Sequence, residues 1–170
     1  MSTSFIIGFC VGILVVAIVC IILSKKNCRN KYDERQKAIQ GVAYKFGFLA
    51  MVAYFIANGI VCMILDDWLP TFIMNFIGIC FGIVCYAGYA IFKDAYISLN
   101  AKPLRFLIYL ALVSAFNYLV FFVNSQTNKG TPEIYLTNLI CAILLTAVCA
   151  MIIIKIIIDK SREKKELVEE

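Results

Sequence analysis

Residues 71–92 read TFIMNFIGICFGIVCYAGYAIF, a stretch without a single charged side chain. A hydrocarbon layer about 30 Å thick is crossed by about 20 apolar residues in a helix, so this stretch is long enough to span a membrane. Four further stretches have the same character: 5–23, 46–65, 106–123 and 134–158. Because all five are apolar on every side, the sequence predicts an all-α polytopic membrane protein with five transmembrane helices.

The composition of the 170 residues indicates the same class. Charged residues make up only 16% of the chain, whereas soluble domains carry about 25%. Hydrophobic residues make up 62%, more than a soluble core of this size can bury, which excludes a soluble enzyme, a nucleic-acid-binding domain and a disordered chain. We expect one transmembrane domain over residues 1–170, in contact with the lipid bilayer, with residues 159–170 as a cytoplasmic helical tail.

The positions of the lysines and arginines predict the orientation. All of them except Lys129 lie between the first two stretches, between the third and fourth, or at the end of the chain. Since cytoplasmic loops carry the excess of basic residues, we expect the N-terminus outside and the C-terminus in the cytoplasm. The net charge of +5 then reflects orientation and contact with anionic lipid, and no nucleic-acid partner is expected.

Capping residues mark several helix ends. Asp33 and Gln36 form a capping-box pattern that starts a helix ahead of 46–65. Pro103 and the run Thr131-Pro132-Glu133 are typical of the first turns of helices over 106–123 and 134–158. Charges that alternate at helical spacing predict that the tail continues the last helix.

Side chains used in catalysis and metal binding are scarce. Histidine is absent, and no acidic or basic residue lies near the middle of any apolar stretch. The eight cysteines include no C-x-x-C pair, and we interpret them as small packing residues. We therefore expect no catalytic residue, no metal site, no cofactor and no enzymatic activity.

Small residues predict close helix packing. Gly8 and Gly12 are four residues apart in the first stretch, and Gly78 and Gly82 are four apart in the third. Glycines on one helix face let two backbones approach closely in a membrane. These glycines serve helix packing within the chain or, for Gly8 and Gly12, pairing of the first stretch with another chain.

Four asparagines occupy one depth. Asn58, Asn75, Asn117 and Asn138 come from four different stretches and lie roughly 6–11 Å below the outer membrane boundary, at a rise of about 1.5 Å per residue. An amide facing lipid would lack a partner, so we expect all four to point inward. They form either a structural hydrogen-bonded layer or the floor of a small polar pocket.

Two polar clusters flank the second and third stretches on the predicted cytoplasmic side. The first contains Asp33, Glu34, Arg35 and Gln36, and the second contains Lys93, Asp94, Tyr96 and Asn100. We expect Asp94 to pair with Arg35 or Arg105, and Asp33 with Lys93. The clusters serve either as helix caps and interfacial anchors or as a docking face for a protein partner.

These clusters carry a resemblance. The run from Tyr32 to Gln36, Tyr-Asp-Glu-Arg-Gln, and the run from Lys93 to Tyr96, Lys-Asp-Ala-Tyr, resemble motifs of a loose group of small polytopic membrane proteins from Gram-positive bacteria. That group has no established activity. The resemblance implies a bacterial plasma membrane location.

Two functional hypotheses follow. The first is a non-catalytic accessory or regulatory membrane subunit, which acts through helix packing and the docking face toward a membrane or cytoplasmic partner. The alternative is a small carrier or channel for a neutral or weakly polar solute, which works as a homo-oligomer and uses the asparagine layer.

Overall fold

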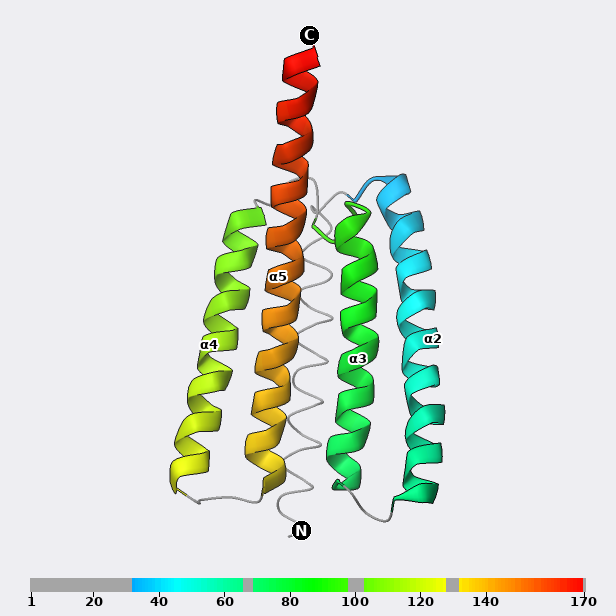
Figure 1. The fold of residues 1–170 in the computed structure, drawn as a ribbon, viewed down its shortest axis with the longest axis vertical. Coiled ribbons are helices and arrows are strands. Elements are labelled where there is room, and N and C mark those ends of the chain that lie inside the picture. Colours follow the sequence, from blue (N-terminus) through cyan, green and yellow to red (C-terminus); the bar gives the residue numbers. More distant parts are fainter. Residues whose placement is uncertain (1–31, 66–68, 98–102, 128–131, 170) are drawn as a thin grey trace. The chain divides into compact units, whose positions relative to one another are not determined.

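The structure, a computed structural model, describes residues 32–65, 69–97, 103–127 and 132–169. These residues form four helices, and no strand occurs among them: α2 (Glu34–Ile64), α3 (Thr71–Phe92), α4 (Pro103–Thr127) and α5 (Pro132–Glu169) (Figure 1). They belong to one compact unit, residues 32–97 and 101–170. The predicted span 5–23, with Gly8 and Gly12, lies outside the described residues, and so does Asn100.

All four described helices are long and apolar enough to cross a membrane. This confirms the helices predicted over 46–65, 71–92, 106–123 and 134–158 and is compatible with a multi-pass membrane protein. α5 also continues to Glu169, as expected for a helical tail. Its 38 residues make it about 57 Å long, nearly twice the thickness of a hydrocarbon layer.

The helix starts follow the local sequence. The Asp33 carboxylate accepts a hydrogen bond from the backbone N–H of Glu34 at 2.7 Å, and the Asp33 N–H donates to Oε1 of Gln36 at 3.4 Å. The predicted capping box is therefore present at the start of α2. α4 and α5 begin at Pro103 and Pro132, where the missing N–H of proline is not needed.

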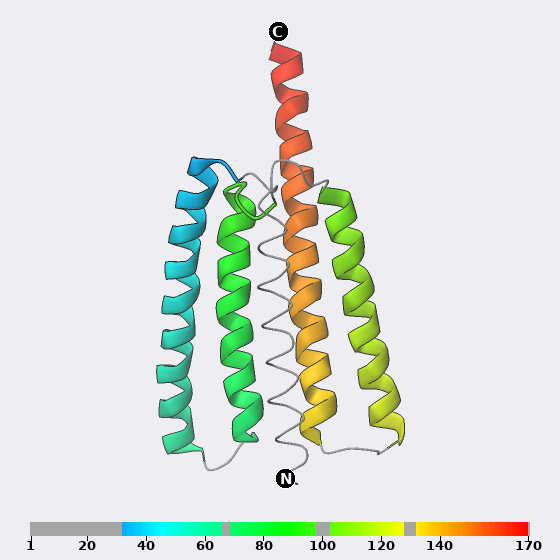
Figure 2. The same ribbon diagram turned by 180° about the vertical axis from the view of Figure 1, so that it is seen from behind.

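The described helices are arranged in a row in the order α2, α3, α5, α4 (Figures 1 and 2). α3 contacts α2 and α5, and α5 contacts α4. Among these four helices, α2 makes no contact with α4 or α5, and α3 makes none with α4. Each helix therefore has at most two neighbours within the described unit.

Small residues bring α2 and α3 close together. A Cβ atom added to Gly47 would lie 2.8 Å from the carbonyl oxygen of Gly82, and one added to Gly82 would lie 3.0 Å from that of Gly47. Gly78 faces the ring of Tyr54, which also donates a hydrogen bond to the carbonyl of Met74 at 2.9 Å. These contacts place Gly78 and Gly82 in packing within the chain.

A cluster of buried hydrophobic side chains lies between α3 and α5. Ala87 and Ile91 of α3 are buried in contact with Val148 and Ile152 of α5. Partly buried side chains surround this core, among them Phe106, Leu107 and Leu110 of α4. The core thus joins the middle helices and positions the ends of α3 and α5 relative to each other.

Candidate functional site

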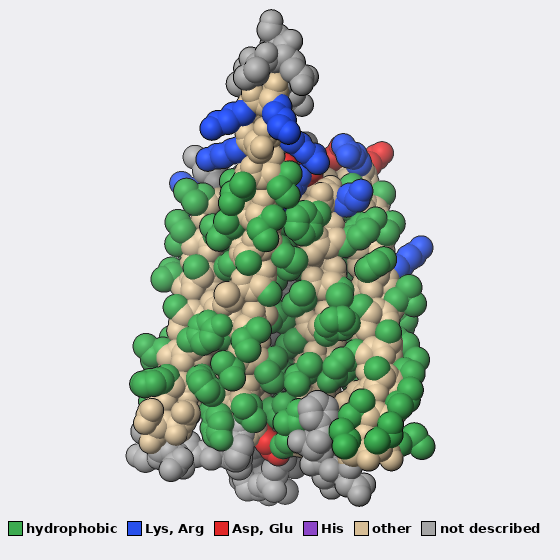
Figure 3. Space-filling model, viewed as in Figure 1, with side chains coloured by type: hydrophobic (Ala, Val, Ile, Leu, Met, Phe, Trp, Pro, Cys, Tyr) green, Lys and Arg blue, Asp and Glu red, His purple; other side chains and the backbone are tan. Residues whose placement is uncertain are grey.

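The charged residues gather at one end of the helix row. We call it the charged end: α2 and α4 begin there, α3 ends there, and α5 extends beyond it (Figure 3). Every lysine and arginine of the described residues lies toward this end, although Lys45 is about three turns into α2. At the opposite end, Glu133 is the one charged side chain within the described ranges.

The loop after α3 has a defined backbone structure. The N–H of Asp94 donates to the carbonyl of Ile91 at 3.1 Å, and that of Ala95 donates to the carbonyl of Ala90 at 2.8 Å. This is the Schellman pattern that closes many helices. Asp94 occupies the left-handed position with φ of 59°, where glycine is commonest and where aspartate is tolerated better than most residues. Ala95 is fully buried.

Side chains of α2 hold this loop. Nε2 of Gln36 donates to the carbonyl of Asp94 at 2.8 Å and to that of Ile97 at 3.4 Å. Gln40 donates to the carbonyl of Ala95 at 2.7 Å. Together with the closing N–H bonds, these contacts satisfy polar groups that helix packing removes from water. The structure thus joins the two sequence clusters through the backbone of the loop.

An ion pair attaches the same loop to α5. Nζ of Lys155 lies 3.1 Å from a carboxylate oxygen of Asp94 and 2.8 Å from Oδ1 of Asp159. The expected pairing of Asp94 with Arg35 or Arg105 is therefore wrong. The order of the helices explains this for Arg105, because α5 is the neighbour of α3, whereas α4, which carries Arg105, is one helix further away. The expected pair of Asp33 with Lys93 is also not formed; the Asp33 carboxylate caps α2 instead.

The predicted docking residues separate into two sets. Gln36 is buried at 8% exposure, and Tyr96 is partly buried against Phe106, with ring centroids 5.6 Å apart. Burial raises the pKa of the Tyr96 hydroxyl. These two side chains shape the loop from the inside. Four others remain exposed at the surface and form no ion pair with any described residue: Asp33, Glu34, Arg35 and Lys93.

Three residues of this site are missing from the predicted docking face, although Tyr32 belongs to the first sequence motif. Tyr32 donates from its hydroxyl to the carbonyl of Tyr96 at 3.5 Å. Gln40 lies one turn after Gln36 on the same face of α2, a spacing that could have indicated its role. Lys155 had no such signal, because its partner Asp94 is distant in sequence.

The four asparagines are distributed along the row. Asn58 lies on α2, Asn75 on α3, Asn138 on α5 and Asn117 on α4. Asn75 is exposed, and Nδ2 of Asn117 donates to the carbonyl of Val113 in its own helix at 2.8 Å. Because α2 and α4 do not touch, no interior of this described unit collects all four.

A polar contact inside the membrane region joins α4 to α5. Ser114, 4% exposed, donates from Oγ to the carbonyl of Ala142 at 3.1 Å and lies 2.9 Å from Oγ1 of Thr146. Oγ1 of Thr146 lies 3.4 Å from the hydroxyl of Tyr118. Within the described ranges, no group of cysteine and acidic side chains is arranged to hold a metal ion.

Comparison with known proteins returned no match: no family model, no curated protein and no solved structure is similar to the chain. The resemblance of the two motifs to small membrane proteins of Gram-positive bacteria stays a prediction.

Proposed function

We propose that the chain is a non-catalytic accessory or regulatory subunit of a bacterial plasma membrane, which binds a protein partner through its charged end. In this proposal the protein has five spans, including 5–23, with the N-terminus outside and the charged end in the cytoplasm. One observation carries it: the loop after α3 is held by α2 and α5 at once, while charged side chains beside it stay exposed and form no ion pair with any described residue.

The order of this surface favours binding. Gln36 and Gln40 fix the loop from α2, and Lys155 fixes it from α5. A surface that is already ordered loses little conformational entropy when a partner docks. Folding alone does not need exposed charges at Glu34 and Arg35, since the helix cap is supplied by Asp33 and Gln36.

The exposed charges have mixed sign. Glu34 and Arg35 lie at the start of α2, Lys93 lies at the end of α3, and the extension of α5 presents Lys160 and Arg162. Mixed charges select a partner by complementarity more than they add affinity. A cytoplasmic domain or loop fits this surface if its charges are opposite in sign at the matching positions.

Photo-crosslinking in the host cell tests the proposal. The photoreactive residue p-benzoylphenylalanine replaces Arg35 at the charged end or, as a matched control, Gln126, which is exposed at the opposite end. We expect one discrete adduct with a second protein from position 35 and none from position 126. Adducts of the chain only with itself, or equal adducts from both positions, would contradict a docking face at the charged end.

The alternative function, a homo-oligomeric carrier or channel, is favoured by one observation. Asn75 is exposed within an apolar helix, and an amide in hydrocarbon requires a polar partner. A second copy of the chain could supply that partner. The test is uptake of small neutral solutes into liposomes that contain the purified protein, compared with the Asn75→Leu variant.

A further inference from the structure

We propose that an open groove between α2 and α3 binds one anionic phospholipid, with an acyl chain in the groove and the phosphate between Lys37 and Lys93. The inference goes beyond the docking of a protein partner and does not depend on it. It rests on the shape of the groove, on two tyrosines at one of its ends, and on the register of the two lysines.

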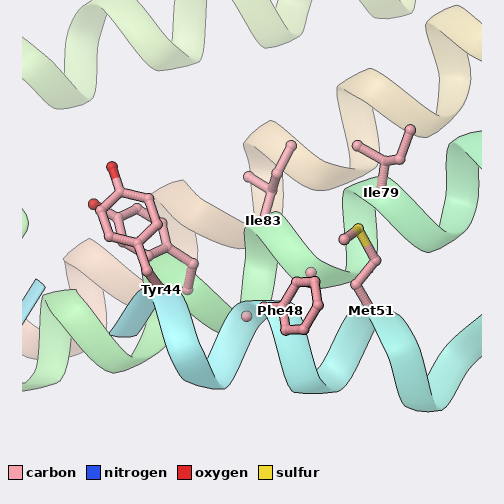
Figure 4. Close-up of a pocket in the computed structure, with 8 residues that line it drawn as sticks. Tyr44, Phe48, Met51, Ile79 and Ile83 are labelled. Atoms are coloured by element: carbon pink, nitrogen blue, oxygen red, sulfur yellow. The ribbon is translucent and has the colours of Figure 1, made fainter. Parts of the chain in front are cut away.

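The groove is apolar and has a glycine floor. It encloses about 260 Å³ (Figure 4) and is lined by Tyr44, Gly47, Phe48, Met51, Ile79, Gly82, Ile83 and Tyr86. At the two glycines the backbones of α2 and α3 approach closely, so backbone atoms form the floor of the groove. Tyr44 is 64% exposed, Phe48 60% and Ile83 46%, so the groove is open to its surroundings. In a bilayer these surroundings are hydrocarbon chains.

Two stacked tyrosines lie at the end of the groove that is nearer the charged end. The rings of Tyr44 and Tyr86 have centroids 4.5 Å apart and are inclined by 24°. Tyrosine places its ring in apolar surroundings and its hydroxyl toward polar groups, which is why it is enriched at membrane interfaces. The pair therefore marks the level at which the groove changes from hydrocarbon to headgroup.

The two lysines have the same sequence spacing from the two stacked tyrosines. Lys37 precedes Tyr44 by seven residues, and Lys93 follows Tyr86 by seven. Seven residues are two helical turns, or about 10 Å, so Lys37 lies on the groove-lining face of α2 beyond Tyr44. Lys93 is the C-cap residue directly after α3 and continues the line of Tyr86 past the helix end. Because α2 and α3 run in opposite directions, both lysines come to the same end of the groove. Both are exposed.

Lys37 and Lys93 form no ion pair with any described residue. The Asp94 carboxylate is paired with Lys155, and the Asp33 carboxylate accepts the N–H of Glu34. Glu34, one turn before Lys37, forms no ion pair with it or with any other described residue. Two ammonium groups without an ion-pair partner among the described residues, beyond the end of an apolar groove, match the order of groups in an anionic phospholipid, with the phosphate beyond the acyl chain.

Native mass spectrometry with added lipid tests the charge requirement. The purified protein is titrated with phosphatidylglycerol or with zwitterionic phosphatidylcholine, and the dissociation constant of the first bound lipid is measured. We expect tighter binding of phosphatidylglycerol. The double variant Lys37→Gln/Lys93→Gln should weaken it by about 30-fold, from about 1 kcal/mol per lysine near an anionic lipid. The matched control Lys164→Gln/Lys165→Gln removes the same charge from the exposed extension of α5 and should leave the affinity unchanged.

A second pair of variants tests the groove without changing charge. Ile83→Trp fills the groove with an apolar ring, and Ile153→Trp makes the same change at a residue of equal exposure on α5. Loss of the first phosphatidylglycerol only with Ile83→Trp supports the proposal. Wild-type affinity in Lys37→Gln/Lys93→Gln, an equal loss in the α5 control, or full binding by Ile83→Trp would each overturn it.

Discussion

The substitution Gly47→Ala tests the close contact of α2 with α3. Its new Cβ would lie 2.8 Å from the carbonyl oxygen of Gly82 and 3.0 Å from Cβ of Tyr86. The first of these is a backbone atom that cannot rotate away. The two helices must therefore separate by about 0.6 Å before the contact becomes an ordinary one.

The expected loss in free energy of unfolding is about 1–3 kcal/mol, the usual cost of an extra methyl group in a packed interface. The gain in helix propensity from glycine to alanine, about 1 kcal/mol, offsets part of it. Gly41 provides the matched control, because a Cβ there meets nothing within 4 Å. Gly41→Ala on the same helix should therefore leave stability unchanged or raise it.

Thermal unfolding in mild detergent, followed with a thiol-reactive dye, measures both variants. Cys80 on α3 is 8% exposed, so its labelling reports loss of packing around that helix. Gly47→Ala should unfold at a lower temperature than the wild type, and Gly41→Ala should not. Equal behaviour of the two variants would refute the close approach of the backbones.

Substitutions at four further positions have defined outcomes. Ser114→Ala should lower the free energy of unfolding by about 0.6–1.7 kcal/mol, the range for hydrogen bonds between helices in membranes, in the same thermal assay. Gln36→Leu leaves loop carbonyls without a donor, so the backbone amide of Ala95 should exchange its hydrogen faster. Unchanged exchange would argue that Gln36 does not hold the loop after α3. Asp94→Ala and Asp94→Gly both remove the ion pair, but only alanine is strained at φ of 59°, so alanine should be the less stable by about 1 kcal/mol. Asn117→Leu should leave folding and any partner complex intact, because the bond that its amide donates among the described residues is to its own helix; loss of solute uptake would favour the carrier.

The helices were predictable because a membrane imposes length and apolarity on each span. Residues 71–92 coincide with α3, and the capping box at Asp33 starts α2 well before its apolar stretch. Both signals are local, since they depend on neighbours within one turn or on the composition of one segment. The helical extension of α5 follows from alternating charges in the same way.

The neighbours of each helix could not be predicted. A helix that is apolar on all sides carries no stripe to show which face meets another helix, and its rotation is set by packing. The pairing of Asp94 with Lys155 depends on α5 lying beside α3, and the contact of Gly47 with Gly82 joins two helices. For the same reason, the equal depth of the four asparagines did not reveal that Asn58 and Asn117 lie on helices that do not touch.

Docking of a protein partner at the charged end is tested most directly by weighing the native complex. The tagged chain is purified in mild detergent from the membranes of its own host, and native mass spectrometry gives the mass of the assembly. We expect a complex with a different protein, which Arg35→Glu dissociates and Gln126→Glu at the opposite end does not. An assembly that contains only copies of this chain and lipid would contradict it.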